Sequence, residues 1–267
     1  MPELPEVETI ARSLRPKLVG RTILDARLRW KRTLATPTAA EFRRRIRGQR
    51  VRDVGRRAKF LHIALQDYSL LIHLRMSGDL VIRSAAAPPE KHDRLILTLS
   101  NGRQLVFNDT RKFGRVWLTE TTDGVFEKLG PEPLGRAFTE QWLHTALRAR
   151  RRQLKPLLLD QAFLAGLGNI YVDEALHMAK LHPLRVSNTV TGRQGSRLHG
   201  AIRAVLHEGI RRNGASIDWV YRGGDYQNHF RVYDRSGEAC RVCGRKIQRM
   251  VVGQRGTYFC PGCQKLR

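Results

Sequence analysis

The stretch MPELPEVETIARSLRPKLVG (residues 1–20) is the segment from which the rest of the chain can be interpreted. Its apolar side chains recur at helical spacing, at Leu4, Val7, Ile10, Ala11, Leu14 and Leu18. Pro5 suits the first turn of a helix, and Gly20 suits its end. We therefore expect an amphipathic N-terminal helix whose apolar face packs against a core.

Removal of Met1 would leave Pro2 with a free secondary amine. Such an amine can attack an aldehyde carbon and form an iminium ion, which stays positively charged without a proton and accepts electrons in later eliminations. An α-amine titrates near pH 8, against about 10.4 for lysine, and a helix start further favours its neutral form. Glu3 or Glu6 could transfer protons beside it. Pro and Glu are also ordinary residues at a helix start, so the pattern alone leaves both interpretations open.

The charge balance predicts a polyanionic partner. The 267 residues include 49 Lys and Arg and 24 Asp and Glu, a net charge of +25. Residues 1–130 hold 26 basic and 14 acidic side chains, and residues 131–267 hold 23 and 10, so the excess is shared by both halves. This distribution suits two lobes that bind one nucleic acid, although a generally basic surface would have the same counts.

Targeting signals and membrane spans are not apparent. No apolar run approaches the roughly 20 residues of a membrane-spanning helix, and the start lacks the layout of a secretory signal. We expect a cytoplasmic protein. All four cysteines lie in the last 28 residues, which favours a local metal site over a disulfide framework.

Residues 21–130 consist mainly of short runs rich in branched side chains, separated by turn residues. These runs are 22–24, 60–65, 70–74, 80–82, 95–99 and 104–107. The pattern predicts an antiparallel β-sandwich with the N-terminal helix packed on it. Two prolines and two glycines in residues 130–136 then indicate a domain boundary.

Beyond this boundary the apolar period becomes helical, over 142–151, 156–164, 170–179 and 195–212. We expect a β-sandwich domain at 2–130, a linker at 131–136, a helical domain at 137–235 and a metal-binding module at 236–267. Residues 217–230 are expected to form a mobile loop, followed by a strand at 231–235.

The four cysteines have the spacing of a structural zinc site. Cys240-x-x-Cys243 and Cys260-x-x-Cys263 are separated by sixteen residues, and four thiolates leave no open position on a tetrahedral ion. Arg245, Lys246, Arg249 and Arg255 lie between the pairs. A hairpin with these cations at its tip could contact phosphates, or it could serve only to stabilise the C-terminus.

The order of these motifs resembles the formamidopyrimidine-DNA glycosylase family over essentially the whole chain. The resemblance implies an α+β fold with an N-terminal β-sandwich, a helix–two-turn–helix around 164–169 and a zinc finger. It implies that Pro2 is the nucleophile and Glu3 its acid/base partner. It also implies that Lys59 and Arg255, in Arg56-Arg57-Ala58-Lys59-Phe60 and Gly253-Gln254-Arg255-Gly256-Thr257, bind phosphates near the damaged nucleotide.

The same resemblance implies further residues that contact DNA. Met76, Arg111 and Phe113 match the family's trio that fills the space left by an everted base, although singly Met76 and Phe113 would suit a core and Arg111 a surface. Asn169 is implied to hold a phosphate at a helix start, where it could equally be an N-cap. Lys155 matches a lysine near the lesion pocket, and His92 and Arg94 are candidate phosphate contacts. Arg75, Thr110 and Lys112 depart from the usual pattern, which puts the opposite-base preference in doubt.

The expected function is therefore a bifunctional DNA glycosylase and AP lyase for oxidised purines. The expected partner is double-stranded DNA with oxidised purines or abasic sites, bound by a nucleoid-associated monomer with one structural Zn²⁺. Two alternatives remain open. An endonuclease VIII-like enzyme would remove oxidised pyrimidines, but Leu4 and the trio argue against it. A non-catalytic lesion-binding protein would bind DNA in a salt-dependent way and leave it intact.

Overall fold

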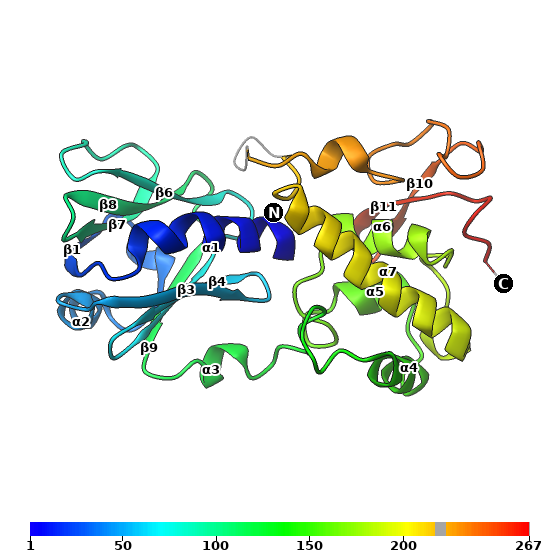
Figure 1. The fold of residues 1–267 in the computed structure, drawn as a ribbon, viewed down its shortest axis with the longest axis horizontal. Helices are drawn as coiled ribbons and strands as arrows, with labels where there is room; N and C mark the ends of the chain where they lie inside the picture. The colour runs from blue at the N-terminus through cyan, green and yellow to red at the C-terminus, as the bar shows by residue number, and fades with distance from the viewer. Residues whose placement is uncertain (217–222, 267) are drawn as a thin grey trace. The chain divides into compact units, whose positions relative to one another are not determined.

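The computed structural model describes residues 1–216 and 223–266. Its internal contacts divide the chain into two units, which are described separately (Figure 1). The described residues of unit 1 are Met1–Glu127, Ser216 and Gly223, and those of unit 2 are 128–215 and 224–266. The expected change from strands to helices therefore occurs close to the glycine- and proline-rich stretch at 130–136.

Two β-sheets form unit 1. The four-stranded sheet contains, in spatial order, β1 (Ile23–Leu28), β7 (Asp93–Leu99), β8 (Arg103–Asp109) and β6 (Gly78–Ser84). The five-stranded sheet contains β2 (Leu34–Thr36), β9 (Arg115–Thr119), β5 (Ser69–His73), β4 (Phe60–Leu65) and β3 (Val51–Arg57). Adjacent strands are antiparallel except for the short edge strand β2, which pairs in parallel with β9. The antiparallel β-sandwich is thus confirmed, with one parallel exception at an edge.

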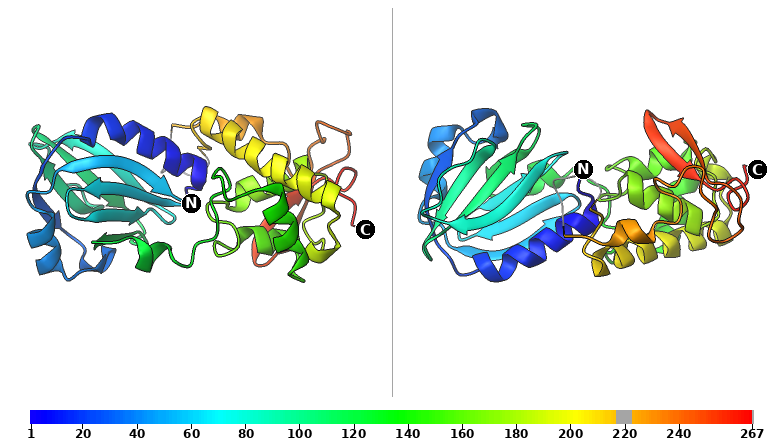
Figure 2. Two further views of the ribbon diagram at one scale, coloured as in Figure 1. Left: turned by 60° about the horizontal axis from the view of Figure 1, so that its bottom comes forward. Right: turned by 90° about the horizontal axis from the view of Figure 1, so that it is seen from above.

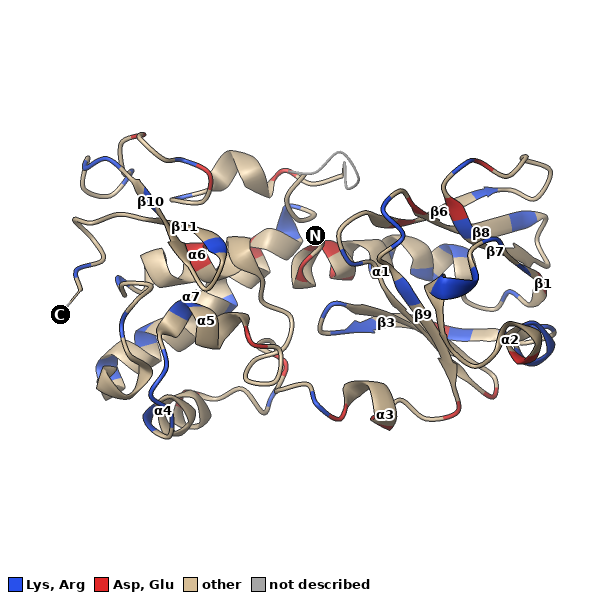
Figure 3. Cartoon of the chain, turned by 180° about the vertical axis from the view of Figure 1, so that it is seen from behind, with Lys and Arg blue, Asp and Glu red and all other residues tan. Residues whose placement is uncertain are grey.

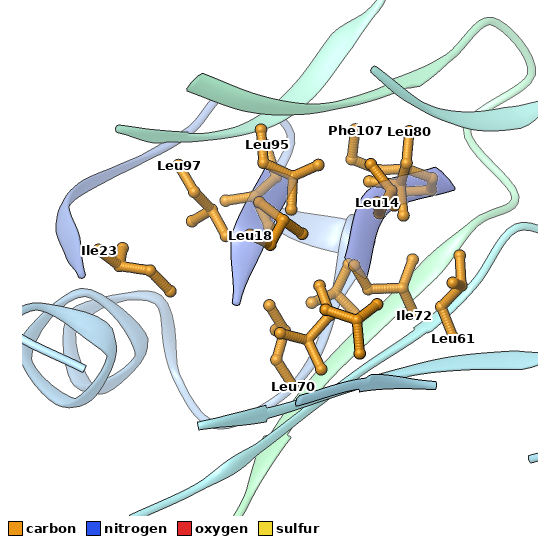
Figure 4. Packing of buried hydrophobic residues seen from close by; sticks show 14 of the residues in the cluster. Leu14, Leu18, Ile23, Leu61, Leu70, Ile72, Leu80, Leu95, Leu97 and Phe107 are labelled. Atoms are coloured by element: carbon orange, nitrogen blue, oxygen red, sulfur yellow. The ribbon is translucent and has the colours of Figure 1, made fainter. Parts of the chain in front are cut away.

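Helix α1 (Leu4–Leu18) packs against this sandwich as its apolar spacing predicts. Leu14 and Leu18 lie among side chains from both sheets (Figure 4). Burial of a leucine side chain is worth about 2 kcal/mol, so this face anchors the N-terminus firmly. Gly20 follows the helix with a φ of 81°, a conformation that glycine adopts without a steric cost.

Several elements of unit 1 lack a clear sequence signal. They are β2, β3, β9, α2 (Ala39–Ile46) and the single turn α3 (Asp123–Phe126). β3 is an edge strand of sequence VRDVGRR, in which only Val51 and Val54 are buried. Its conformation depends on pairing with β4, a long-range contact that a local pattern does not reveal.

Unit 2 is helical and ends in a β-hairpin. Its elements are α4 (Glu140–Arg148), α5 (Leu154–Leu159), α6 (Asn169–Met178), α7 (Gly192–Arg211), β10 (Gln248–Val252) and β11 (Arg255–Phe259). Turns at 160–168 join α5 to α6, and α7 and β11 both pack on α6 (Figure 2). Short 3₁₀ segments occur at Lys31–Thr33, Ser187–Thr189 and Tyr226–His229.

The strand expected at 231–235 is wrong, because these residues form turns. The N–H groups at 231–233 donate to the buried carboxylate of Glu174 on α6. Part of the expected 217–230 loop, residues 217–222, lies outside the described residues. Among the helices of the described residues, none combines the length and hydropathy needed to cross a membrane.

Candidate active site and nucleic-acid interface

The N-terminal residues are held by a capping box. The Glu3 N–H donates to Glu6 Oε2 at 2.8 Å, and the Glu3 side chain accepts from the Glu6 N–H. Pro2, Glu3 and Glu6 are all buried. Because Glu3 is the N-cap, Pro2 directly precedes the first helical turn, where exposed N–H groups favour negative charge. Glu6 thus has a structural role. Glu3 directly follows Pro2 and carries the carboxylate nearest to it in the sequence.

Lys59 lies in the two-residue turn between β3 and β4. Arg57 pairs with Phe60, and Ala58 has a φ of 54°. Lys59 is only 5% exposed, so it is not the solvated edge residue that its position in the sequence would suggest. The pKa of His73 on β5 is lowered to about 3, mainly by burial, then by the charge of Arg75 and then by that of Lys59. His73 is therefore neutral, and its Nδ1 accepts from the Arg75 N–H at 3.0 Å.

The trio of Met76, Arg111 and Phe113 lies on two exposed turns. Met76 is 43% exposed and Phe113 is 51% exposed, so neither is a core residue. The Arg111 guanidinium carbon lies 5.0 Å from the centroid of the Phe113 ring. The two turns are neighbours because Gly78 at the start of β6 pairs with Asp109 at the end of β8. The structure therefore presents one flexible apolar, one cationic and one aromatic side chain together.

Arg94 and His92 belong to the same end of the sheet, but Arg94 has a structural environment. Arg94 Nε donates to the Asp109 carbonyl at 2.7 Å, Nη1 donates to the Lys91 carbonyl at 3.4 Å and Nη2 contacts His92 Nδ1 at 3.2 Å. The residue is buried, whereas His92 is partly exposed. These bonds connect Arg94 to the backbone around the trio.

Lys155 and Asn169 converge on one backbone carbonyl in unit 2. Lys155 Nζ and Asn169 Nδ2 each donate to Gly256 O at 2.9 Å, and Lys155 Nζ also donates to Asp173 Oδ1 at 2.7 Å. Lys155 is completely buried. Gly168 is the N-cap of α6 and Asn169 is the first helical residue, so the Asn169 side chain binds β11 and does not cap its own helix.

Arg255 stands at the tip of the β10–β11 hairpin and is exposed. Gly253 and Gln254 both have positive φ, as the two central residues of a type I′ hairpin turn require. Arg255 is the one cation of the expected set at the tip, because Arg249 pairs with Tyr258 farther along the hairpin. Arg245 and Lys246 precede β10 altogether.

Four cysteine sulfurs form a group suited to one metal ion. The Sγ atoms of Cys240, Cys243, Cys260 and Cys263 all lie within 4.8 Å of one another. Cys240 and Cys263 are 3.9 Å apart, and Cys243 and Cys260 are 3.4 Å apart. Zn–S bonds of about 2.3 Å in a tetrahedron place sulfurs roughly 3.8 Å apart, so the four thiolates fit one Zn²⁺. His177 Nε2 lies 3.5 Å from Cys240 Sγ.

Family models match this architecture segment by segment. The formamidopyrimidine-DNA glycosylase N-terminal domain matches residues 1–116, and the H2TH domain of the same family matches residues 129–220. The zinc finger found in FPG and IleRS matches residues 237–266. The chain belongs to the formamidopyrimidine-DNA glycosylase family.

Relatives and solved structures agree over the full length. The formamidopyrimidine-DNA glycosylase of Pelotomaculum thermopropionicum is 46% identical over 100% of both chains. That of Chloroflexus aurantiacus is 49% identical over 99% of this chain and 98% of its own. The Lactococcus lactis Fpg complex with DNA containing an abasic site has a TM-score of 0.94 at 37% identity, over 99% of this chain and 100% of that one. A MutM complex with DNA containing carbocyclic 8-oxo-G has a TM-score of 0.94 at 38% identity, with the same coverage.

The residues expected to depart from the usual family pattern all lie on the trio's two turns. Arg75 and Lys112 have left-handed backbones, with φ of 55° and 61°. Lys112 Nζ lies 4.2 Å from the Trp30 ring centroid, and Thr110 is exposed. Arg75, the departure expected to add bulk and charge, directly precedes Met76 in the sequence.

Three buried acidic residues were not expected from the sequence. Asp109, Asp173 and Glu174 are 0% exposed, and each accepts hydrogen bonds from backbone N–H groups of another segment. The sequence contains one usable signal, since consecutive acidic residues inside the apolar helix pattern at 170–179 must be paired if they are buried. No comparable signal distinguishes Asp109 from a surface turn residue.

Proposed function

We propose that this chain is a bifunctional DNA glycosylase and AP lyase of base excision repair, which removes formamidopyrimidines and 8-oxoguanine from double-stranded DNA. Family membership over the full length supports the activity class. The observation that carries the mechanism is the position of Pro2, directly before the N-cap Glu3 of a buried helix start. A rigid element is the appropriate support for a nucleophile that must meet one carbon atom.

The first stage is base removal, and it requires loss of Met1 so that Pro2 has a free amine. The lone pair of the Pro2 nitrogen forms a bond to C1′ as the glycosidic bond breaks. The departing purine takes the bonding electron pair and a proton. Loss of the amine proton then allows the nitrogen to expel O4′, which Glu3 protonates as the sugar ring opens. The product is an iminium ion between Pro2 and C1′.

The second stage is strand cleavage. The iminium acidifies the C2′ proton, and its removal gives an enamine that expels the 3′-phosphate oxygen in β-elimination. Loss of the C4′ proton and of the 5′-phosphate oxygen completes δ-elimination. The phosphates are strong leaving groups for this purpose when cations balance their charge.

Lys59, Asn169 and Arg255 are the residues that we assign to backbone phosphates, and Met76, Arg111 and Phe113 to the space left by the everted base. Exposure of Arg255 and of the trio supports these roles. Lys155 and Arg94 are buried and donate to carbonyl and carboxylate oxygens of the protein, which favours indirect roles for them. The single zinc would hold the 237–266 module together without contact to substrate. We further propose that the enzyme acts as a monomer in the bacterial cytoplasm, associated with the nucleoid.

Borohydride trapping tests this function directly. Protein lacking Met1 is incubated with duplex DNA that contains one 8-oxoguanine opposite cytosine, and the adduct is located by mass spectrometry. We expect a covalent adduct at the Pro2 nitrogen, its loss in Pro2→Gly, and a strong reduction in Glu3→Gln. Parallel duplexes with formamidopyrimidine or thymine glycol separate the purine enzyme from an endonuclease VIII-like one. Absence of any adduct, even on a pre-formed abasic site, would leave a non-catalytic binding protein.

A further inference from the structure

One buried carboxylate contacts both turns that carry the trio. Asp109 ends β8 and is 0% exposed. Its Oδ1 accepts from the Ser77 hydroxyl and from the Arg111 N–H at 3.2 Å, and its Oδ2 accepts from the Gly114 N–H at 2.7 Å. Ser77 follows Met76 and Gly114 follows Phe113 in the sequence. Each bond thus reaches a trio residue or its direct neighbour.

The surroundings of Asp109 are themselves fixed. The Asp109 N–H donates to the His92 carbonyl at 2.9 Å, and the Asp109 carbonyl accepts from Arg94 Nε at 2.7 Å. Both turns also pack directly on the Phe107 ring. A Cβ at Gly78 would lie 2.7 Å from that ring, and a Cβ at Gly114 would lie 2.3 Å from it. Backbone can approach the ring so closely only at glycine, so neither turn can move toward the ring, and the bonds to Asp109 oppose movement away from it.

We propose that Asp109 is a positioning residue that clamps the two turns into one rigid unit, so that Met76, Arg111 and Phe113 enter the DNA together. This inference rests on the proposed function. Eversion of a base leaves a gap that must be filled before the base returns to the stack. Three side chains on independently moving turns would lose conformational entropy during that step, which would weaken binding. In a preformed unit this entropy is already lost when the protein folds.

Asp109→Asn is the sharpest variant because it keeps the shape and removes one acceptor. If the amide nitrogen replaces Oδ1 it faces the Arg111 N–H, and if it replaces Oδ2 it faces the Gly114 N–H. An amide nitrogen at Oδ2 brings two donors together and releases the Gly114 turn, whereas an amide nitrogen at Oδ1 leaves the Arg111 N–H with only its bond to the Ser77 hydroxyl at 3.0 Å. Ser77→Ala is the milder variant because it leaves both N–H bonds to Asp109 in place. It removes the bond from the Ser77 hydroxyl to Asp109 Oδ1 and the bond at 3.0 Å from the Arg111 N–H to the same hydroxyl.

Asp93→Asn is the matched control. Asp93 is 1% exposed and lies on the neighbouring strand β7. Its carboxylate accepts from Arg83 Nη1, from the Glu90 N–H and from Asn108 Nδ2, so it fastens the turn before β7 and neither turn of the trio. A general loss of stability in this sheet should appear in both variants, but loss of the clamp should appear only in Asp109→Asn.

Two substrates separate positioning from chemistry. The first is duplex DNA with 8-oxoguanine opposite cytosine, with 2-aminopurine next to that cytosine as a reporter of lost stacking. The second is single-stranded DNA with a pre-formed abasic site, which has no base to evert and no opposite strand. For Asp109→Asn we expect single-turnover excision from the duplex to fall at least about tenfold, because a buried donor is left unsatisfied at the clamp. The 2-aminopurine signal should fall with it, while cleavage of the single strand should stay within about twofold of wild type.

Ser77→Ala should show a smaller decrease of the same kind, and Asp93→Asn should behave as wild type on both substrates. Equal losses on both substrates in Asp109→Asn, or an unchanged 2-aminopurine signal, would overturn the positioning role while the proposed function stands. An inactive wild type on both substrates would instead refute the proposed function, and this inference with it.

Discussion

Some buried polar side chains of this protein have environments that their sequence context does not suggest. His73 lies in an apolar strand pattern, yet it stands beside Arg75 and Lys59, and burial with these charges lowers its pKa to about 3. Because the imidazole is neutral, it does not repel the two neighbouring cations. The positive charges of Arg75 and Lys59 therefore suit the binding of an anion. Lys155 is the converse case, a buried lysine whose ammonium group donates to Asp173 Oδ1 and to Gly256 O.

The low pKa of His73 predicts acid sensitivity. The unfolded imidazole titrates near 6.5, so unfolding binds a proton between about pH 3 and 6.5, and stability falls as the pH is lowered through that window. His73→Gln should remove up to about 1.4 kcal/mol per pH unit from the pH dependence of the unfolding free energy, as measured in urea titrations. His207→Gln, at an exposed position of α7, is the control and should leave the slope unchanged. An unaltered slope in His73→Gln would show that the imidazole is protonated in the folded state.

At the scale of elements, α6 organises the C-terminal half of unit 2. Asp173 accepts from Lys155 and from the Tyr258 N–H at 2.9 Å, while Glu174 accepts from the N–H groups of residues 231–233. Burial raises the pKa of Asp173 to about 7 against the opposing effect of Lys155. Two adjacent carboxylates therefore connect one helix to both the zinc-finger hairpin and the segment that leads to it.

Lys155→Met should loosen the hairpin. It leaves the buried Asp173 carboxylate without its cation and removes one of two donors to Gly256 O, which should cost about 3–5 kcal/mol of stability in unit 2. Faster hydrogen exchange at residues 255–259 and weaker DNA binding should follow. Lys128→Met, at an exposed position, is the control. The added change Asp173→Leu should restore only part of the stability, because it removes the unpaired carboxylate but also the acceptor of the Tyr258 N–H. It does not restore the bond to Gly256 O, so binding should stay weak; full recovery of stability and binding would contradict the anchoring role.

Removal of zinc should affect the same hairpin by another route. A strong chelator should release one Zn²⁺ per chain and disorder residues 237–266. The buried cluster beside the hairpin is too small to hold it without the metal, since it consists of Val232, Cys240, Ile247 and Cys260 and two of these are cysteines of the metal group. Hydrogen exchange should rise at β10 and β11 and stay protected in the sheets of unit 1. Retention of hairpin protection after complete zinc release would show that α6 alone holds it.

At the scale of the whole molecule, Lys and Arg are distributed over both units and are not confined to a tail (Figure 3). The net charge of +25 should make DNA association fast and strongly dependent on salt. The basic residues nevertheless differ in role, because some are exposed and others, such as Arg94 and Lys155, are buried in hydrogen-bond networks.

Salt titration can separate these roles. The slope of log affinity against log salt changes by about 0.9 for each phosphate contact that is lost. Arg255→Gln should reduce the slope by about that amount on non-specific duplex DNA. Arg43→Gln, at an exposed position of α2, is the control and should change it much less. Equal effects of the two variants would indicate a diffuse electrostatic contribution without a specific Arg255 contact.

Local features were predictable from the sequence. The helix at 4–18, most strands of the β-sandwich, the helices around 140–211 and the four-cysteine group depend on periodicity or spacing within short segments, which a single sequence displays directly. The family resemblance, carried by the order of the motifs, also identified the activity class. The strands β2, β3 and β9 were missed because pairing with distant strands, and not their own composition, determines them.

The sequence by itself therefore determined the division into a β-sandwich half and a helical half, the amphipathic helix behind Pro2 and the metal site. Only the tertiary structure decided which polar residues support the site. Asp109 joins turns that are more than thirty residues apart, and Lys155 meets a carbonyl 101 residues away. Their burial requires hydrogen-bond partners, and those partners become neighbours only when the sheets pair and α6 packs against the hairpin.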